Sequence, residues 1–419
     1  MNQRPPNEPS RHFPQPHRLW DDPSRHASSL GCPSCQEFNR CGGVHTDAGI
    51  LDCHDLCSCT DRGRCDNVCR FNPGLFVARM REIEGLGFEN APRVPVRSTP
   101  ALPLIAPFVD HRYARSAMLD VPTVALSLYE VVNMATGEVH VTSRQALADR
   151  FRIPVNSTIV LSGVDKDAPI ESWWALKNRP EILEKLFELG IGVVTSPNYS
   201  VLTDVPRTDN LHAMKRILLT WIEMAAAGLA AALHVNSRTE QDYQRWGDLI
   251  AERAEIQIIA FEFATGGGRG ERIDWHVEQL SKLADRVGRG LALVIRGGGR
   301  KLPILRKHFA QVTLIETDAF YKAHRRRRAY LTEAGRLKWA KQLTPAGAAI
   351  DELLANNVAV VRAHFELGLE PELRLRSARR TANSNDETAQ YGLLRYFDLA
   401  SEAGGIAGDS HHMIATAKA

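Results

Sequence analysis

Residues 256–300 read IQIIAFEFATGGGRGERIDWHVEQLSKLADRVGRGLALVIRGGGR, and this stretch holds the repeating unit of the fold. Two short apolar runs, Ile256–Phe263 and Leu291–Arg296, flank an amphipathic stretch at Asp274–Val287. Apolar runs of about four to eight residues that alternate with stretches of helical length indicate strand–helix–strand units and a parallel sheet. We therefore expect a strand over each run and a helix between them.

The same alternation continues in both directions between about residues 119 and 368. Further strands are expected at Thr123–Val132, Thr158–Leu161, Gly192–Ser196, Ala230–Val235 and Val312–Glu316. Further helices are expected at Ser143–Phe151, Glu171–Leu189, Asn210–Gly228, Thr239–Ala254 and Pro303–Phe309. At least six strands follow one another, and no dinucleotide fingerprint comes after the first. This favours an α/β fold with a complete or partial TIM-like (β/α) barrel over an open α/β sheet.

The rest of the 419-residue chain differs in composition from this barrel region. Residues 1–28 are rich in Pro, Arg, His and Ser and are expected to form a disordered arm. A cysteine-rich module is expected at 29–72, a helix and a Pro-rich linker at 73–118, the barrel at 119–368, and a flexible tail at 369–419. The net charge is only +3, which argues against electrostatic binding of a polyanion by the whole surface.

All eight cysteines lie within one short segment, and we interpret that segment as a metal-binding module. They are Cys32, Cys35, Cys41, Cys53, Cys57, Cys59, Cys65 and Cys69. The first residues form no apolar leader, and no run of about 18 apolar residues occurs, so we expect a cytoplasmic protein without a membrane partner. Dense cysteines in a reducing compartment are typical of metal ligands, and a disulfide scaffold is the alternative.

The metal itself stays open at this point. Two four-cysteine Zn²⁺ sites would satisfy the count, and so would two [4Fe–4S] clusters. His45 or His54 could replace a cysteine ligand in either case. The Cys53-x3-Cys57-x-Cys59 spacing is one residue short of the radical-SAM pattern, so that chemistry is not carried over.

Polar residues follow the expected strands at the edge where barrel enzymes hold their active sites. Candidate acid–base or nucleophilic groups are Asp165, Glu262, Asp318 and His234. Candidate substrate-binding groups are Asn198, Asn236 and Arg296. Glu262 and Arg296 each end an apolar run, and a carboxylate there is costly unless it is paired or used. A functional carboxylate and a structural Glu262–Arg296 ion pair are both consistent with this pattern.

Two glycine clusters and one basic run are the remaining candidates. Gly297, Gly298 and Arg300 follow a strand and precede Lys301, an arrangement that lets backbone N–H groups and cations approach a phosphate. Tight turns that need glycine for steric reasons explain the same residues. The run Arg325, Arg326, Arg327 and Arg328 lies between two tyrosines, which suits nucleic-acid contact, whereas many charge runs are only solvated surface.

One stretch resembles a family of known proteins. Residues 173–180 (WWALKNRP), 192–200 (GVVTSPNYS) and 203–206 (TDVP) look like an uncharacterised family of phages and mobile elements. That family has a tryptophan before Asn-x-Pro, followed by an (S/T)PDFS…D(M)P loop after a strand; with this chain's residues included, the shared pattern is SP(D/N)(F/Y)S…DxP. The resemblance covers about residues 160–265 and implies fold and genomic setting only. Asn198 stands where the family has an acid, so no catalytic carboxylate is expected at that position.

Together these features predict a metal-containing barrel enzyme that acts on a phosphate-bearing substrate, a nucleotide or a nucleic acid. Base or nucleoside modification of the glycosyl type fits paired carboxylates in a barrel, as in transfer-RNA guanine transglycosylases. The zinc cysteines of that family follow the barrel, whereas the cysteines of this chain precede it. The alternatives are a non-catalytic, zinc-stabilised nucleic-acid-binding protein of a mobile element and an iron–sulfur redox protein.

Overall fold

A computed structural model describes residues 82–113, 115–202, 207–265, 272–345 and 347–369. These residues divide into two compact units, of which residues 82–328 and 340–359 form the first. Residues 329–339 and 360–369 belong to the second unit. The eight cysteines, the arm at 1–28, the glycines at 266–270 and the tail from 370 onward lie outside the described residues.

The first unit contains an eight-stranded, fully parallel sheet that is nearly closed into a barrel. Its strands are β1 (Ile105–Pro107), β2 (Thr123–Ser127), β3 (Thr158–Ser162), β4 (Val193–Thr195), β5 (Ala231–His234), β6 (Ile258–Glu262), β7 (Ala292–Arg296) and β8 (Gln311–Glu316). Their spatial order is β1-β8-β7-β6-β5-β4-β3-β2. Between the two end strands, Phe108 pairs with Ala125, and Val109 N donates a hydrogen bond to Ala125 O at 3.0 Å.

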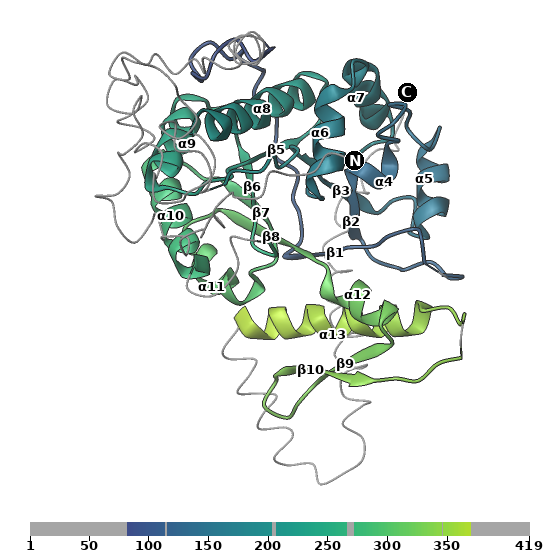
Figure 1. Cartoon of the computed structure of the whole chain (residues 1–419). Helices are drawn as coiled ribbons and strands as arrows, with labels where there is room; N and C mark the ends of the chain where they lie inside the picture. The colour runs from purple at the N-terminus through teal and green to yellow at the C-terminus, as the bar shows by residue number, and fades with distance from the viewer. Residues whose placement is uncertain (1–81, 114, 203–206, 266–271, 346, 370–419) are drawn as a thin grey trace, which may run out of the picture. The chain divides into compact units, whose positions relative to one another are not determined.

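Helices follow the strands along the chain. They are α4 (Leu128–Val131), α5 (Arg144–Phe151), α6 (Asp167–Ala175), α7 (Arg179–Glu188), α8 (Arg207–Ala226), α9 (Glu240–Glu252), α10 (Arg272–Val287), α11 (Leu302–Leu305) and α12 (Asp318–His324). Figure 1 shows α8, α9 and α10 outside the strands β5, β6 and β7. A 3-10 helix, η6 (Gly299–Lys301), precedes α11. The hairpin of β9 (Arg327–Leu331) and β10 (Leu337–Lys341) and the helix α13 (Asp351–Leu369) follow α12.

Burial explains why the apolar runs form strands rather than loops. Every residue of β6 is buried, and so are the first four of β7, as expected for parallel strands that are covered on both faces. Trp173, Trp221 and Trp246 are each 1% exposed or less and pack in the core. No helix of the described part is long and apolar enough to cross a membrane.

The barrel-like fold predicted from the sequence is therefore confirmed, with corrections to individual elements. The strand predicted at Thr123–Val132 ends at Ser127, because Ser127 caps the short helix α4 by accepting a hydrogen bond from Tyr129 N. The single helix predicted at Glu171–Leu189 is two helices, because Leu176 is extended and Pro180 lies in the first turn of α7.

One correction changes the start of the barrel. The strand β1 lies inside the segment 73–118, which the sequence predicted as a helix and linker, and it pairs with β8 in parallel. The barrel therefore begins before residue 119. Pro103 lies two residues before this three-residue strand and Pro107 is its last residue. Prolines are ordinarily signals against a strand, so the sequence pattern concealed it.

Candidate active site

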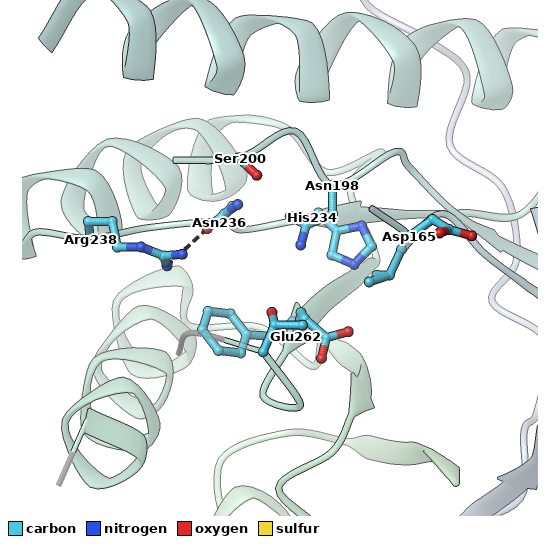
Figure 2. A pocket seen from close by; sticks show the side chains of 10 residues that line it. Asp165, Asn198, Ser200, His234, Asn236, Arg238 and Glu262 are labelled. Atoms are coloured by element: carbon cyan, nitrogen blue, oxygen red, sulfur yellow. Dashed lines mark hydrogen bonds between the residues drawn. The ribbon is translucent and has the colours of Figure 1, made fainter. Parts of the chain in front are cut away.

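A pocket opens at the carboxyl ends of β3, β4, β5 and β6, where barrel enzymes place their catalytic groups. It holds about 500 Å³ of empty space, part of which is open to solvent. Its lining residues are Val164, Asp165, Asn198, Ser200, His234, Asn236, Arg238, Phe261, Glu262 and Thr265. Figure 2 shows seven of them from close by.

Glu262 supplies a carboxyl group with an unusual environment at the end of β6. Its residue is 7% exposed, and its Oε1 accepts a hydrogen bond from Ala264 N at 2.6 Å. Its Oε2 is buried and accepts no hydrogen bond from the described residues. Burial raises the pKa of the Glu262 carboxyl to about 7, although Arg296 and backbone N–H groups lower it part of the way back. Glu262 is therefore able to gain or lose a proton near neutral pH.

Arg296 is the charged neighbour of Glu262. The two residues are direct partners in the register of β6 and β7, and Arg296 Nη1 lies 3.7 Å from Glu262 Oε2. The structure thus places the ion pair that the two apolar runs indicated. The remaining contacts of the guanidinium are weak, because Nη1 lies 3.5 Å from Val164 O and Nε is buried without a hydrogen bond among the described residues. Arg296 therefore retains donor capacity for an anionic group.

His234 faces the pocket as a neutral imidazole. Its Nδ1 lies 2.5 Å from the carbonyl oxygen of Ser196, which can only accept, so we assign the proton to Nδ1. The Nε2 atom then carries a lone pair. Burial lowers the pKa of His234 to about 4, which keeps the ring uncharged at neutral pH. His234 can therefore accept a hydrogen bond from a ligand at Nε2 while it stays uncharged.

The strand ends of β4 and β5 add amides and a cation. Asn236 Nδ2 donates to Tyr199 O at 2.9 Å, and Asn236 Oδ1 accepts from Arg238 Nη1 at 3.2 Å (Figure 2). The backbone N–H of Asn198 donates to Gly163 O at 3.0 Å, and its Oδ1 is buried without a hydrogen bond among the described residues. These contacts hold one cation and two amides at the pocket wall.

Arg238 is a pocket residue that the sequence patterns did not single out. It lies two residues after Asn236, and burial lowers the pKa of its guanidinium. A cation three residues after the predicted strand Ala230–Val235 was the signal that could have identified it. The Thr239–Asp242 capping box then begins α9 and fixes the chain beyond Arg238.

The predicted candidates divide into those that the pocket brings together and those that lie elsewhere. Asp165, Glu262, His234, Asn198 and Asn236 all line the pocket. Asp165 is exposed on the loop after β3, across the pocket from Arg238 in Figure 2. Arg296 is not a lining residue itself but adjoins the pocket through Glu262. Asp318, Gly297, Gly298 and Arg300 are also not among the lining residues.

Asp318 begins α12, and its neighbour Glu316 is the buried carboxyl at this strand end. Glu316 Oε1 accepts a hydrogen bond from Asp318 N at 2.6 Å, and Oε2 accepts one from Ala319 N at 3.0 Å. Burial raises the pKa of Glu316 to about 7. These bonds satisfy N–H groups in the first turn of the helix, so Glu316 has a structural role there.

Close packing accounts for the glycines after β7. Gly297 and Gly298 have φ angles of +74° and +70°. A Cβ on Gly297 would lie 2.7 Å from Ala264 N, and one on Gly298 would lie 2.7 Å from the ring of Phe263. The steric explanation of these two glycines therefore needs no phosphate.

One group of described side chains has the composition of a metal site. The ligand atoms of Asp110, His111 and Glu130 lie within 4.8 Å of one another. Arginine side chains already neutralise the negative charge of this group, because Arg112 pairs with Asp110 at 2.5 Å and with Glu130 at 3.3 Å. Arg150 Nη2 lies 2.8 Å from His111 Nε2, so this nitrogen accepts and the ring proton lies on Nδ1, facing the carboxylates. That arrangement suits an ion-pair network better than a metal.

The comparisons with known proteins add no family. No protein-family model matches the chain, and no curated protein is significantly similar to it. Fold and pocket together define an α/β protein with a nearly closed parallel barrel and a polar pocket at its carboxyl edge.

Proposed function

We propose that the protein is an enzyme that performs general acid–base chemistry on a phosphate-bearing substrate, a nucleotide or a nucleic acid. The carrying observation is the buried Glu262 carboxyl, whose pKa of about 7 matches the working pH and which shares its pocket with the neutral His234. A general acid or base works best when its pKa is near the ambient pH. Strongly shifted carboxyl groups in clefts are candidates for such roles.

Base or nucleoside modification of the glycosyl type is the reaction class that we favour. In this scheme the bond between the sugar C1′ and the base nitrogen breaks, and protonated Glu262 gives its proton to the leaving base. The Asp165 carboxylate stabilises the positive charge that develops on the sugar, or forms a bond to C1′, as paired carboxylates do in glycoside chemistry. A water molecule or an incoming base then forms the new bond to C1′, displacing Asp165 where it has bonded, and gives its proton back to the Glu262 carboxylate. His234 and the amide of Asn236 orient the base through their polar atoms.

The phosphate of the substrate is assigned to the two arginines of the pocket region. Arg296 has weakly satisfied donors, and Arg238 lines the pocket beside Asn236. A guanidinium matches the geometry of a phosphate, and its hydrogen bonds to an anion are strong. We no longer assign this role to Gly297 and Gly298, because their packing already explains them.

The experiment tests one substitution against a matched control. Glu262→Gln keeps the size of the side chain but removes the ionisable group, so turnover should fall by at least about a hundredfold. The purified full chain would be incubated with nucleotides and oligonucleotides, and release or exchange of the base would be measured by mass spectrometry. Glu278→Gln alters an exposed carboxyl on α10 and should leave turnover unchanged.

A separate measurement of substrate affinity distinguishes a loss of catalysis from a loss of substrate binding. The Glu262→Gln variant should bind the substrate about as tightly as the unaltered chain. Equal turnover by both chains would refute the role of Glu262. Binding without turnover by the unaltered chain, over all nucleotide substrates, would favour the non-catalytic alternative.

A further inference from the structure

The hairpin β9–β10 has a register that two backbone hydrogen bonds define. Thr332 N donates to Arg336 O at 3.0 Å, and Gln342 N donates to Arg326 O at 2.8 Å. Paired residues of an antiparallel hairpin have a constant sum of residue numbers, and both bonds give the same sum. Tyr330 is therefore opposite Lys338, and Arg328 is opposite Ala340.

These four residues lie on one face of the hairpin, because alternate residues of a strand point the same way. All four are exposed, and 46% of Tyr330 is accessible. The intervening residue, Ala329, is buried, with only 1% of its surface exposed. The hairpin therefore presents one open face, which carries an aromatic ring with a cation two residues before it and another directly across the ladder.

The charge of this hairpin is strongly one-sided. Residues 325–341 contain seven Lys or Arg and one acid, Glu333. Not all of the cations are available, because Arg326 donates to the carbonyl oxygens of Ala348 and Ala349 and thereby holds the backbone. The four consecutive arginines are thus not equivalent, and the strand register identifies Arg328 as the one beside Tyr330.

We propose that the face formed by Arg328, Tyr330 and Lys338 binds single-stranded nucleic acid, with a base stacked on Tyr330 and backbone phosphates on the two cations. Aromatic rings interleaved with cations bind single strands in this way, and a base within a duplex has no open face to stack. The small side chain of Ala340, opposite Arg328, leaves room beside the ring for a base. This face is a second site, and the inference does not depend on the proposed chemistry of the pocket.

The test uses the full chain and a fluorescently labelled 12-nucleotide oligothymidylate, with binding followed by anisotropy. Tyr330→Leu should weaken binding by about tenfold or more, because it removes the stacking surface. Tyr330→Trp should bind within about twofold of the unaltered chain or more tightly. Tyr330 is exposed, so these variants should keep the thermal unfolding midpoint, which circular dichroism would check.

Salt dependence tests the two cations separately from the ring. Arg328→Gln and Lys338→Gln should each lower the slope of log affinity against log salt by about 0.7, the value for one phosphate contact on a single strand. Lys282→Gln removes an exposed cation on α10 and should leave the slope unchanged.

Three results would overturn the proposal. Tyr330→Leu could bind as tightly as the unaltered chain, which would show that no base stacks there. A duplex of the same length could bind as tightly as the single strand. An acidic peptide such as polyglutamate could compete as well as the oligonucleotide at equal charge, which would identify a general polyanion surface.

Discussion

Glu262 combines two conditions that rarely coexist in a carboxyl group. It is buried at the end of an apolar strand, and its cationic neighbour Arg296 lies too far away for a short hydrogen bond. Burial therefore dominates, and the pKa rises to about 7 instead of falling below its usual value. A modest change in the position of Arg296 relative to Glu262 would change this balance.

Replacing Arg296 should move the titration of Glu262. Arg296→Gln removes a cation that favours the carboxylate, so the pKa of Glu262 should climb above 7, while Arg296→Lys should largely preserve it. Carbon-13 NMR of the Glu262 carboxyl across pH 5–9 measures this directly. A titration midpoint that stays the same or moves to lower pH in Arg296→Gln would show that Arg296 does not lower the pKa of Glu262.

At the scale of elements, apolar runs of strand length identified most of the barrel, because parallel strands are buried on both faces. The run at residues 123–132 (TVALSLYEVV) is mostly apolar and has no clear period, so periodicity alone could not separate β2 from α4. Only the capping hydrogen bond from Tyr129 N to Ser127 marks the change. The strand β1 was hidden because three residues that end in a proline carry almost no pattern, and pairing with β8 forms it.

The loop after β7 offers a test of packing between elements. Gly297→Ala should lower the free energy of unfolding through both its positive φ and the contact with Ala264 N, by about 2–4 kcal/mol. Gly288→Ala has a similar φ of +67° but nothing within 4 Å of the new Cβ, so it should cost only about 1 kcal/mol. Urea denaturation of both variants measures the two losses in the free energy of unfolding, and their difference gives the cost of the contact with Ala264 N. Equal losses would show that this contact costs nothing.

At the scale of the whole molecule, buried ionisable groups set the pH dependence of stability. Glu262 and Glu316 have pKa values of about 7, so their contribution is complete below 4.5 and is lost as pH rises through 7. Burial lowers the pKa of His234 to about 4 and of His276 to about 3, so their contribution is complete above 6.5 and is lost as pH falls toward those values. The two pairs oppose each other between about pH 4.5 and 6.5.

Stability should therefore change little between about pH 5 and 6.5 and decline from there to pH 8. Each glutamate contributes on the order of 1 kcal/mol to the decline above pH 6.5, which is the last part of a total of about 3 kcal/mol that accumulates from pH 4.5. Glu316→Gln mimics the protonated side chain and should reduce the decline above pH 6.5. Urea midpoints at pH 5, 6, 7 and 8 test this prediction. If stability declines as much in Glu316→Gln as in the unaltered chain, the ionisation of Glu316 is not a cause of the decline.

The cysteine segment leads to a prediction for the full chain. Eight thiols between Cys32 and Cys69 should bind metal, so the chain purified without oxygen should contain either zinc or iron. About two zinc ions per chain and no colour indicate zinc sites, whereas broad visible absorbance with iron and sulfide indicates clusters. A chain without metal would refute the metal-binding interpretation.

The sequence by itself determined the parallel α/β class, most strand positions and five of the ten residues that line the pocket. These follow from local patterns, since an apolar run and the polar residue that ends it are neighbours along the chain. Only the tertiary structure decided that Arg238 joins the pocket, that Asp318 does not line it, and that Gln342 pairs with Arg326 to place Tyr330 beside Lys338. Proximity between separate segments depends on strand register and on packing, and neither can be predicted from the residues of one segment alone.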